Sequence, residues 1–266
     1  MNGIGRKLFM AAIVVFIAAP LVVVAGVSLN QERQLLFPPR GLSLQWYLEM
    51  FLQADWQNAI LNSIIVAALS ALIAVTIAFP LAYFLWRYRV RYAPALYALG
   101  VAPFMLPPVI TALGFLIFWT NTPIYGSITT TFLSHAIFFV TLPLVTVTLG
   151  LQSIDRQLIE AATTMGADDR SVFTTVVLPM VRPYLISGYA FAFVLSLNEY
   201  IVSFMVTGLT VETLPIKIFN SLRYGYTPVM ASVSVMFVLV GFLVYGLIAR
   251  FADLPKLLGA WSTRET

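Results

Sequence analysis

The chain has 266 residues, of which 60% are hydrophobic and only 10% are charged. Soluble domains carry roughly 25% charged residues, so this chain has too few polar side chains to cover a globular surface. The composition therefore predicts a membrane protein with several spans. The chain has no cysteine and a single histidine, which excludes disulfides, thiolate chemistry and a histidine-rich metal site. We predict no catalytic residue and no metal site.

Six segments are apolar over the length of about 20 residues that a helix needs to span a bilayer. They are residues 8–29, 60–86, 95–119, 131–150, 184–206 and 230–252. The predicted fold is therefore all-α, with one transmembrane domain over residues 1–266. Arg6 and Lys7 resemble the start of a signal peptide, but the apolar run that follows is longer than the ~7–15 residues of such a peptide and lacks an A-x-A cleavage pattern. We expect an uncleaved first helix.

The basic residues predict which side of the membrane each loop occupies. With a cytoplasmic N-terminus, most of them fall inside, namely Arg6, Lys7, Arg87, Arg89, Arg91, Arg156, Arg170, Arg182, Arg250, Lys256 and Arg264. The outside then carries only Arg33, Arg40, Lys217 and Arg223. This bias predicts that both termini are cytoplasmic, and it accounts for the net charge of +4 without a nucleic-acid partner.

Aromatic residues gather in the outer segment 30–59, and small residues recur along the second span. Trp46, Tyr47, Phe51 and Trp56 are of the kind that prefers the membrane interface, so we predict a short helix on the outer face. In the second span, small residues follow helical spacing at Ser63, Ala67, Ala71, Ala74 and Ala78. This pattern predicts a face that another helix approaches closely, although a chance stripe facing lipid gives the same pattern.

The third span carries three prolines, Pro103, Pro107 and Pro108. Proline removes a backbone donor and bends or breaks a helix, and such a break persists in a membrane only where protein or a cavity satisfies the freed carbonyls. We predict a bend that either lines a transport pathway and acts in its gate or is purely structural.

Glu199 is the only carboxylate well inside a predicted span. Intramembrane acids are unfavourable and usually face an interior cavity. Together with Asn198, Tyr200 and Ser203, it is a candidate substrate-pathway group that balances the charge of a cationic solute; alternatively, it is a hydrogen-bonded residue that fixes helix packing. We interpret His135, at the start of the fourth span, as an interfacial hydrogen-bonding residue.

Residues 151–183 form a polar, charged island between two apolar runs. An apolar stripe at helical spacing, made by Ile154, Leu158, Ala161 and Met165, predicts a first short helix. Ser153 is the expected cap and Asp155 lies in the first turn. Gly166 is expected to end this helix.

A second short helix is predicted to follow the glycine. Asp168 or Asp169 can cap it, and it is expected to end near Val177, where Leu178-Pro179 and then Pro183 precede the fifth span. Two short helices meeting at a glycine form a compact projection that is suited to docking on a soluble partner.

The island resembles the cytoplasmic signature of permease subunits of binding-protein-dependent ABC importers. The signature E-A-A-x-x-x-G followed by L-P occurs here as Glu160-Ala161-Ala162, Gly166 and Leu178-Pro179. Flanking positions also fit, at Leu158, Ala167, Phe173 and Pro183. Asp155-Arg156 departs from the pattern, because many members have a proline there. The resemblance implies a type I ABC importer permease fold whose ATPase-coupling residues are Glu160, Ala161, Ala162, Met165, Gly166, Ala167, Leu178 and Pro179.

Within that family, residues 62–87, 196–208 and 213–228 resemble the second permease of spermidine/putrescine-type importers, a subfamily that also carries opines and phosphonates. The resemblance implies a bacterial inner-membrane protein with three kinds of partner: a homologous permease, two ATPase subunits docked at 151–183, and a soluble binding protein on the outer face. The chain lacks a G-x-x-x-x-G-K-[ST] phosphate loop, so we expect ATP and Mg²⁺ to bind the ATPase subunits and no cofactor to bind this chain.

Two other classes of function remain as alternatives. A stand-alone secondary transporter or channel usually needs several intramembrane ionisable groups to couple an ion gradient, and Glu199 is the only carboxylate available. An intramembrane hydrolase needs a nucleophile and a base within reach of each other, and the sequence shows no convincing serine partner for His135.

Overall fold

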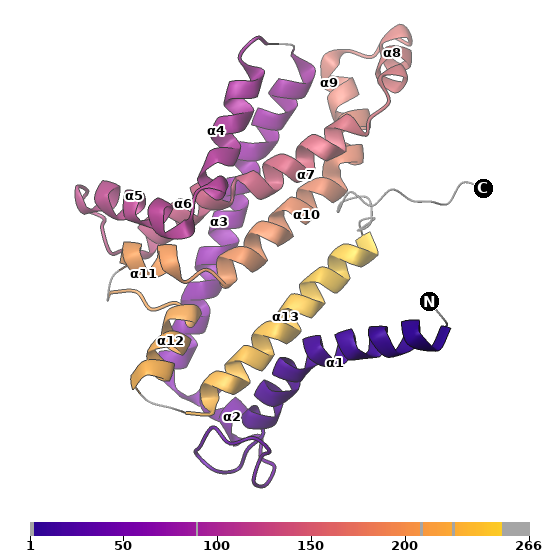
Figure 1. The fold of residues 1–266 in the computed structure, drawn as a ribbon. Coiled ribbons are helices and arrows are strands. Elements are labelled where there is room, and N and C mark those ends of the chain that lie inside the picture. Colours follow the sequence, from indigo (N-terminus) through magenta and orange to yellow (C-terminus); the bar gives the residue numbers. More distant parts are fainter. Residues whose placement is uncertain (1–2, 89, 208–209, 225–226, 252–266) are drawn as a thin grey trace. The chain divides into compact units, whose positions relative to one another are not determined.

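A computed structural model describes residues 3–88, 90–207, 210–224 and 227–251, and every regular element in these ranges is a helix (Figure 1). The predicted all-α fold is confirmed. Arg89, Lys256 and Arg264, which enter the orientation prediction, lie outside the described residues.

The chain divides into two compact units. The first unit comprises residues 1–60 and 216–242 and holds α1 (Gly3–Ser28), α2 (Gln45–Leu52), most of α12 (Leu214–Tyr224) and most of α13 (Val229–Phe251). The second unit comprises residues 61–215 and 243–266. It holds most of α3 (Ala54–Arg87) and all of α4 (Ala93–Met105), α5 (Pro108–Thr120), α6 (Ile128–Phe139) and α7 (Thr141–Gln152). It continues with α8 (Arg156–Thr164), α9 (Asp169–Val172), the π-helical turn η1 (Phe173–Val177), α10 (Leu178–Leu197) and α11 (Ile201–Thr207).

Four helical segments of the described chain are long and apolar enough to cross a membrane: Ile4–Ser28, Ala54–Arg87, Ile128–Gln152 and Asp169–Leu197. The bent pair α4 and α5 makes a fifth if it is counted as one span. The sixth predicted segment corresponds to α13, whose described apolar part, Val229–Val244, is shorter. The six predicted spans are consistent with these helices.

The short helix expected in the outer segment is α2. The Trp46 and Trp56 side chains are buried within the first unit, and Phe51 is exposed. The Trp46 indole N–H donates to the carbonyl of Asn30, and the Tyr47 hydroxyl lies 2.8 Å from Ser28 Oγ. Both indoles therefore pack against protein, whereas the sequence pattern suggested that they contact the membrane interface.

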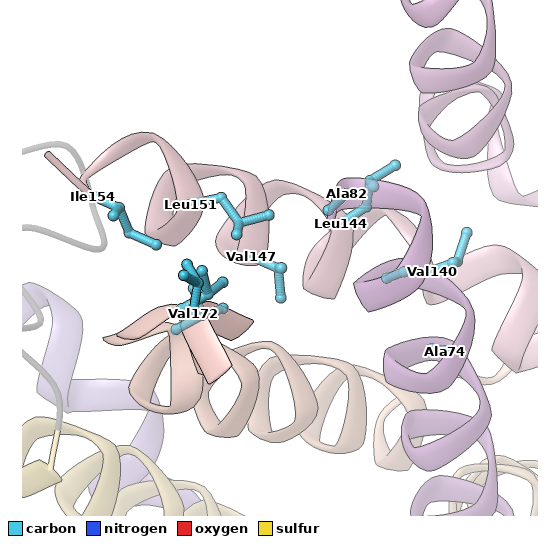
Figure 2. Packing of buried hydrophobic residues seen from close by; sticks show 11 residues of the cluster. Ala74, Ala82, Val140, Leu144, Val147, Leu151, Ile154 and Val172 are labelled. Carbon is cyan, nitrogen blue, oxygen red and sulfur yellow. The ribbon is translucent and has the colours of Figure 1, made fainter. Parts of the chain in front are cut away.

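The small residues of the second span lie on a buried face of α3, as predicted. Their lack of bulk lets neighbouring helices approach closely, which is the main way that helices associate in lipid. The core on this face joins Ala74, Ala78 and Ala82 of α3 to larger side chains of the neighbouring segments (Figure 2). These partners are Val140, Leu144, Val147, Leu151, Ile154, Val172, Val177 and Val181. The alternative of a chance stripe facing lipid is therefore wrong.

The third predicted span breaks sharply at its prolines. Helix α4 ends at Met105, α5 begins at Pro108, and the two axes differ by 101°. The ring of Pro107 disfavours helical backbone at Leu106, which takes an extended conformation with φ −79° and ψ 148°. Pro108 then occupies the first turn of α5, where a missing N–H does no harm. The sequence predicted a bend at this position, and the structure has a right-angled elbow.

Candidate functional site: the polar loop and the broken fifth span

The first helix of the polar island is α8, and its cap differs from the prediction. Asp155 has an extended backbone and accepts a hydrogen bond of 2.9 Å from the N–H of Gln157. Ser153, the predicted cap, still has helical backbone angles, and its hydroxyl donates to the carbonyl of Gly150. The prediction of Ser153 was therefore wrong, because α7 extends to Gln152 and leaves its next residue in a helical conformation that cannot cap a new helix.

The predicted apolar stripe of this helix has two parts with different surroundings. Ile154 is buried in the core beneath the loop. Leu158 and Met165 are 49% and 88% exposed, and no residue of α8 itself is fully buried. The stripe therefore anchors the loop at one end and presents an apolar surface at the other.

Gly166 ends α8 in the way the sequence predicted. Its φ is +90°, a left-handed value that glycine adopts without the steric penalty of a Cβ. The Gly166 N–H donates to the carbonyl of Thr163, and the Ala167 N–H donates to that of Ala162. This pair of bonds is a Schellman motif, and it fixes the direction in which the chain leaves the helix.

The second helix of the island begins as predicted but does not end where predicted. Asp168 caps α9 by accepting a hydrogen bond from the N–H of Ser171, and this interaction lowers the pKa of the Asp168 carboxyl. The chain then continues through η1 directly into α10, so the expected end at Leu178-Pro179 was wrong. The π turn lies just before Pro179, where the α-helical hydrogen-bond pattern is already interrupted, and the missing proline N–H is therefore tolerated.

The island is attached to the end of α3 by a surface ion pair and an aromatic contact. Arg87 Nη2 donates to Asp169 Oδ1 at 3.0 Å. The two side chains are 43% and 80% exposed, so the pair contributes at most about 1 kcal/mol. The ring of Phe173 packs edge-on against Tyr83 with centroids 5.1 Å apart, and against Phe79 at 6.0 Å. Aromatic packing thus makes the larger contribution to this attachment.

A groove of about 310 Å³ runs beside α8. Its lining combines aromatic, basic and acidic side chains: Tyr83, Trp86, Arg87, Arg156, Ile159, Glu160, Asp169, Val172 and Val177. Of the coupling residues implied by the resemblance, Glu160, Ala161, Met165, Gly166 and Pro179 are exposed, and Ala162, Ala167 and Leu178 are half-buried. The structure therefore brings the E-A-A residues and the glycine to one accessible surface, with the L-P pair at the start of α10.

The fifth predicted span, 184–206, is not one helix. Helix α10 ends at Leu197, α11 begins at Ile201, and Glu199 lies in the break. Glu199 Oε1 accepts the N–H of Val202 at 2.8 Å, and Oε2 accepts the N–H of Ser203 at 2.9 Å. The carboxylate thereby caps the positive end of α11. A sequence count based on hydropathy cannot detect this break, because both halves are apolar.

His135 is a member of this site that the sequence analysis misplaced. It is buried rather than interfacial, and its Nε2 lies 3.1 Å from Glu199 Oε2. Its Nδ1 lies 2.7 Å from Ser196 Oγ, and Ser203 Oγ lies 3.0 Å from Nε2. The sequence did contain a signal for this pairing. The predicted spans hold one histidine and one carboxylate, and burying two such polar groups is less unfavourable when they bind each other.

The other candidate pathway residues differ in access. Asn198 is exposed at the break, and Tyr200 is half-buried. The side chain of Glu199 is only 8% exposed. The four predicted pathway residues therefore lie close together, but the carboxylate of Glu199 is enclosed by the groups that donate hydrogen bonds to it.

Comparison with known proteins places this architecture in a family. Residues 78–254 match the model of the family described as the binding-protein-dependent transport system inner membrane component. The chain belongs to this family. It is therefore a multi-pass inner-membrane transport permease, in agreement with its composition and its apolar helices.

Curated relatives of this permease cover most of its length. It is 30% identical to the spermidine/putrescine transport system permease protein PotC of Haemophilus influenzae, over 88% of this chain and 91% of the relative. It is also 30% identical to the putrescine transport system permease protein PotI of Escherichia coli, over 88% of this chain and 87% of the relative. A probable molybdenum ABC transporter permease of Haloferax volcanii is 31% identical over 70% of this chain and 71% of the relative.

Solved structures of ABC importers share the fold. A bacterial ABC transporter involved in the import of the acidic polysaccharide alginate superposes with a TM-score of 0.70 at 16% identity, covering 93% of this chain and 95% of that chain. The methionine transporter MetNI in an inward-facing conformation gives 0.62 at 17% identity, covering 80% of this chain and 98% of that chain. These likenesses show that the permease has the fold of an ABC importer membrane subunit.

Proposed function

We propose that this permease forms half of the pathway of an ATP-driven importer for a small organic cation of the polyamine class. The observation that carries the proposal is the 30% identity to PotC and PotI over nearly the full length of both chains. The carboxylate of Glu199 supports it, because an acid inside the membrane favours a cationic solute over an anionic one. Opines and phosphonates remain other candidates of the same subfamily.

The molybdenum relative suggests a different solute class, an oxyanion. An oxyanion is bound by basic side chains or by free backbone N–H groups. At the break in the fifth span, the N–H groups of Val202 and Ser203 already donate to Glu199. The local chemistry therefore favours a cation.

Energy for transport is proposed to enter through residues 151–183. Leu158 and Met165 present apolar side chains on α8, and Glu160 provides a carboxylate at the adjacent groove. Gly166 sets the exit direction of the chain, so this surface has a fixed shape. We propose that an ATPase subunit docks here and binds the ATP and Mg²⁺, with a second ATPase subunit on a homologous permease partner.

The remaining roles follow from this arrangement. The substrate pathway is proposed to pass Asn198 and Tyr200, which lie in the break and are exposed and half-buried, together with the more enclosed Glu199 and Ser203. The elbow at Pro107 and Pro108 is proposed to allow α5 to change its angle during gating. Pro103, the third proline of the predicted bend, lies inside α4 rather than at the elbow. The positive-inside bias supports cytoplasmic termini. Delivery of solute by a soluble binding protein on the outer face is proposed from the family description, which names a binding-protein-dependent transport system.

Uptake measurements test the proposal directly. The permease, produced with its partner permease, ATPases and binding protein, is expected to accumulate radiolabelled putrescine or spermidine in cells that lack other polyamine uptake. A catalytically inactive ATPase subunit is the matched control and is expected to abolish uptake. Accumulation of molybdate with no uptake of either polyamine would overturn the solute assignment.

A second variant pair tests the docking surface. Glu160→Lys is expected to abolish co-purification of the ATPase subunits while membrane insertion is retained, because it reverses the charge at the groove. Glu32→Lys makes the same charge reversal at an exposed position outside residues 151–183 and is expected to leave co-purification unchanged. Equal co-purification with the two variants would exclude α8 as the docking helix.

A further inference from the structure

The imidazole of His135 bridges the two sides of the break in the fifth span. Its Nδ1 faces Ser196, in the last turn of α10, at 2.7 Å. Its Nε2 faces Glu199, in the break, at 3.1 Å. His135 itself belongs to α6, so one side chain on a neighbouring helix contacts the last turn of α10, the break and, through Ser203 Oγ at 3.0 Å from Nε2, the first turn of α11.

The contact with Glu199 fixes one proton of this cluster. An ionised carboxylate only accepts hydrogen bonds, so the His135 Nε2 carries the proton that faces Glu199. The Ser196 hydroxyl both donates and accepts, so it satisfies His135 Nδ1 in either protonation state of the imidazole. With the N–H groups of Val202 and Ser203 also donating, both carboxylate oxygens of Glu199 are occupied. The side chains of His135 and Glu199 are 1% and 8% exposed, so a solute cannot approach the carboxylate without separating one of these contacts.

The short helix beyond the break packs on α5. Val202 and Val206 of α11 form a buried cluster with Ala112 and Trp119 of α5, and Figure 1 shows the two helices side by side. The Trp119 indole N–H donates to Ser134 Oγ, the neighbour of His135 on α6. Helix α5 also follows a sharp break, at the proline elbow, so the packed pair of α5 and α11 is joined to the helices before it through two breaks in the helical hydrogen-bond pattern.

We propose that His135 is a positioning residue that holds the α10–α11 joint, residues 198–200, closed between transport cycles. Transport then requires its bond to Glu199 to separate, so that the carboxylate can meet the ammonium group of the solute, and to re-form after the solute has left. This inference rests on the proposed function for the identity of the solute. Closure of the joint itself is independent of the solute and is tested separately.

Two substitutions of His135 separate its two contacts. Glutamine places an amide donor near the position of Nε2, so His135→Gln retains the bond to Glu199. Asparagine places its amide near the position of Nδ1, so His135→Asn retains the contact with Ser196 and loses the bond to Glu199. Both replacements are neutral amides, which makes them matched controls for each other.

A cysteine reporter measures whether the joint is open. The chain has no cysteine, so Val206→Cys introduces a single thiol on the buried face of α11. Ala78→Cys places a thiol in the core of α3, where it reports unfolding of the whole unit. Each cysteine reporter is introduced into three versions of the assembled transporter, with His135, His135→Asn or His135→Gln. The rate at which a small maleimide labels the thiol is then measured.

We expect His135→Asn to raise the labelling rate of the Val206→Cys thiol at least about tenfold, since a hydrogen bond to a charged group is lost. His135→Gln is expected to stay within about twofold of the parent, and the Ala78→Cys thiol is expected to remain protected throughout. Equal labelling of the two amide variants would overturn the proposal. Faster labelling of both thiols would also overturn it, because His135 would then support the fold as a whole.

Putrescine uptake by the same variants tests the second half of the proposal. His135→Asn is expected to lower the rate of ATP-driven uptake several-fold, with normal co-purification of the ATPases, and His135→Gln is expected to retain it. Equal uptake by the asparagine variant and the parent would refute a role in transport. If the parent transports no polyamine, the proposed function fails, and the labelling result still decides whether His135 closes the joint.

Discussion

Substitutions at Gly166 distinguish two effects on the loop: the cost of its left-handed backbone and the space that a docked partner leaves beside it. The glycine has a φ of +90°, and a Cβ built on it has no atom within 4 Å. Alanine therefore meets no steric obstacle within the chain, and its whole effect arises from the left-handed backbone. That conformation costs an L residue roughly 1–2 kcal/mol.

The structure predicts an order of effects for three replacements. Gly166→Asn is expected to be the mildest, because asparagine tolerates left-handed backbone better than other non-glycine residues. Gly166→Ala is expected to reduce the docked fraction by about five- to thirtyfold, the equivalent of about 1–2 kcal/mol. Within the chain, leucine has the same backbone penalty as alanine, and its Cβ also has no atom within 4 Å. We therefore assign any additional loss with Gly166→Leu to a partner surface close to the loop.

The assay is co-purification of the ATPase subunits with each variant from detergent-solubilised membranes, normalised to the amount of permease. We expect the alanine variant to lose part of the co-purifying ATPase and the leucine variant to lose all of it. If leucine and alanine behave alike, no partner surface lies against Gly166. If all three variants match the parent, the left-handed turn is not needed for docking, and the reasoning is refuted.

Three further predictions follow from the packing and electrostatics. Gly188→Ala places a Cβ 2.7 Å from the α7 backbone, and overpacking should lower stability by about 1–3 kcal/mol. Gly114→Ala in α5, with nothing within 4 Å, should instead raise stability by up to about 1 kcal/mol, because alanine is the better helix former. Arg87→Ala should reduce uptake less than about fivefold, because its ion pair is exposed, and exchanging Arg87 with Asp169 should restore the parental rate. The Asp168 pKa is lowered in the fold, so its cap is present above the ordinary value of 3.8 and is lost only as the pH falls through the lower folded value. Co-purification between about pH 5 and 8 should therefore show no step from Asp168; such a step would contradict the cap.

Features that depend on local sequence were the ones predicted well. The small face of α3 follows from residue spacing along one helix, and Gly166 ends α8 because few other residues adopt its backbone conformation. The elbow at Pro107 was predicted in position but not in angle. The angle depends on how α5 packs against α6 and α11, which spacing along one segment does not specify.

Features that depend on distant residues were missed or misplaced. The break in the fifth span results from Glu199 capping α11 and pairing with His135, a residue far away in the sequence. A hydropathy value is a sum over the residues of one segment. It cannot show that the carboxylate of Glu199 accepts hydrogen bonds from backbone N–H groups a few residues later and so ends one helix and starts another. The continuation through Leu178-Pro179 was missed for a similar reason, since the π turn that accommodates the proline has no distinct sequence pattern.

Transport by purified components tests the central claim most directly, namely that a separate ATPase drives this permease through residues 151–183. Proteoliposomes containing both permeases are supplied with the binding protein and labelled putrescine, with or without the ATPase subunits and ATP. We predict accumulation only when the ATPase and ATP are both present, and its loss with Glu160→Lys. Accumulation of putrescine against its gradient by the permeases without any ATPase would contradict the claim.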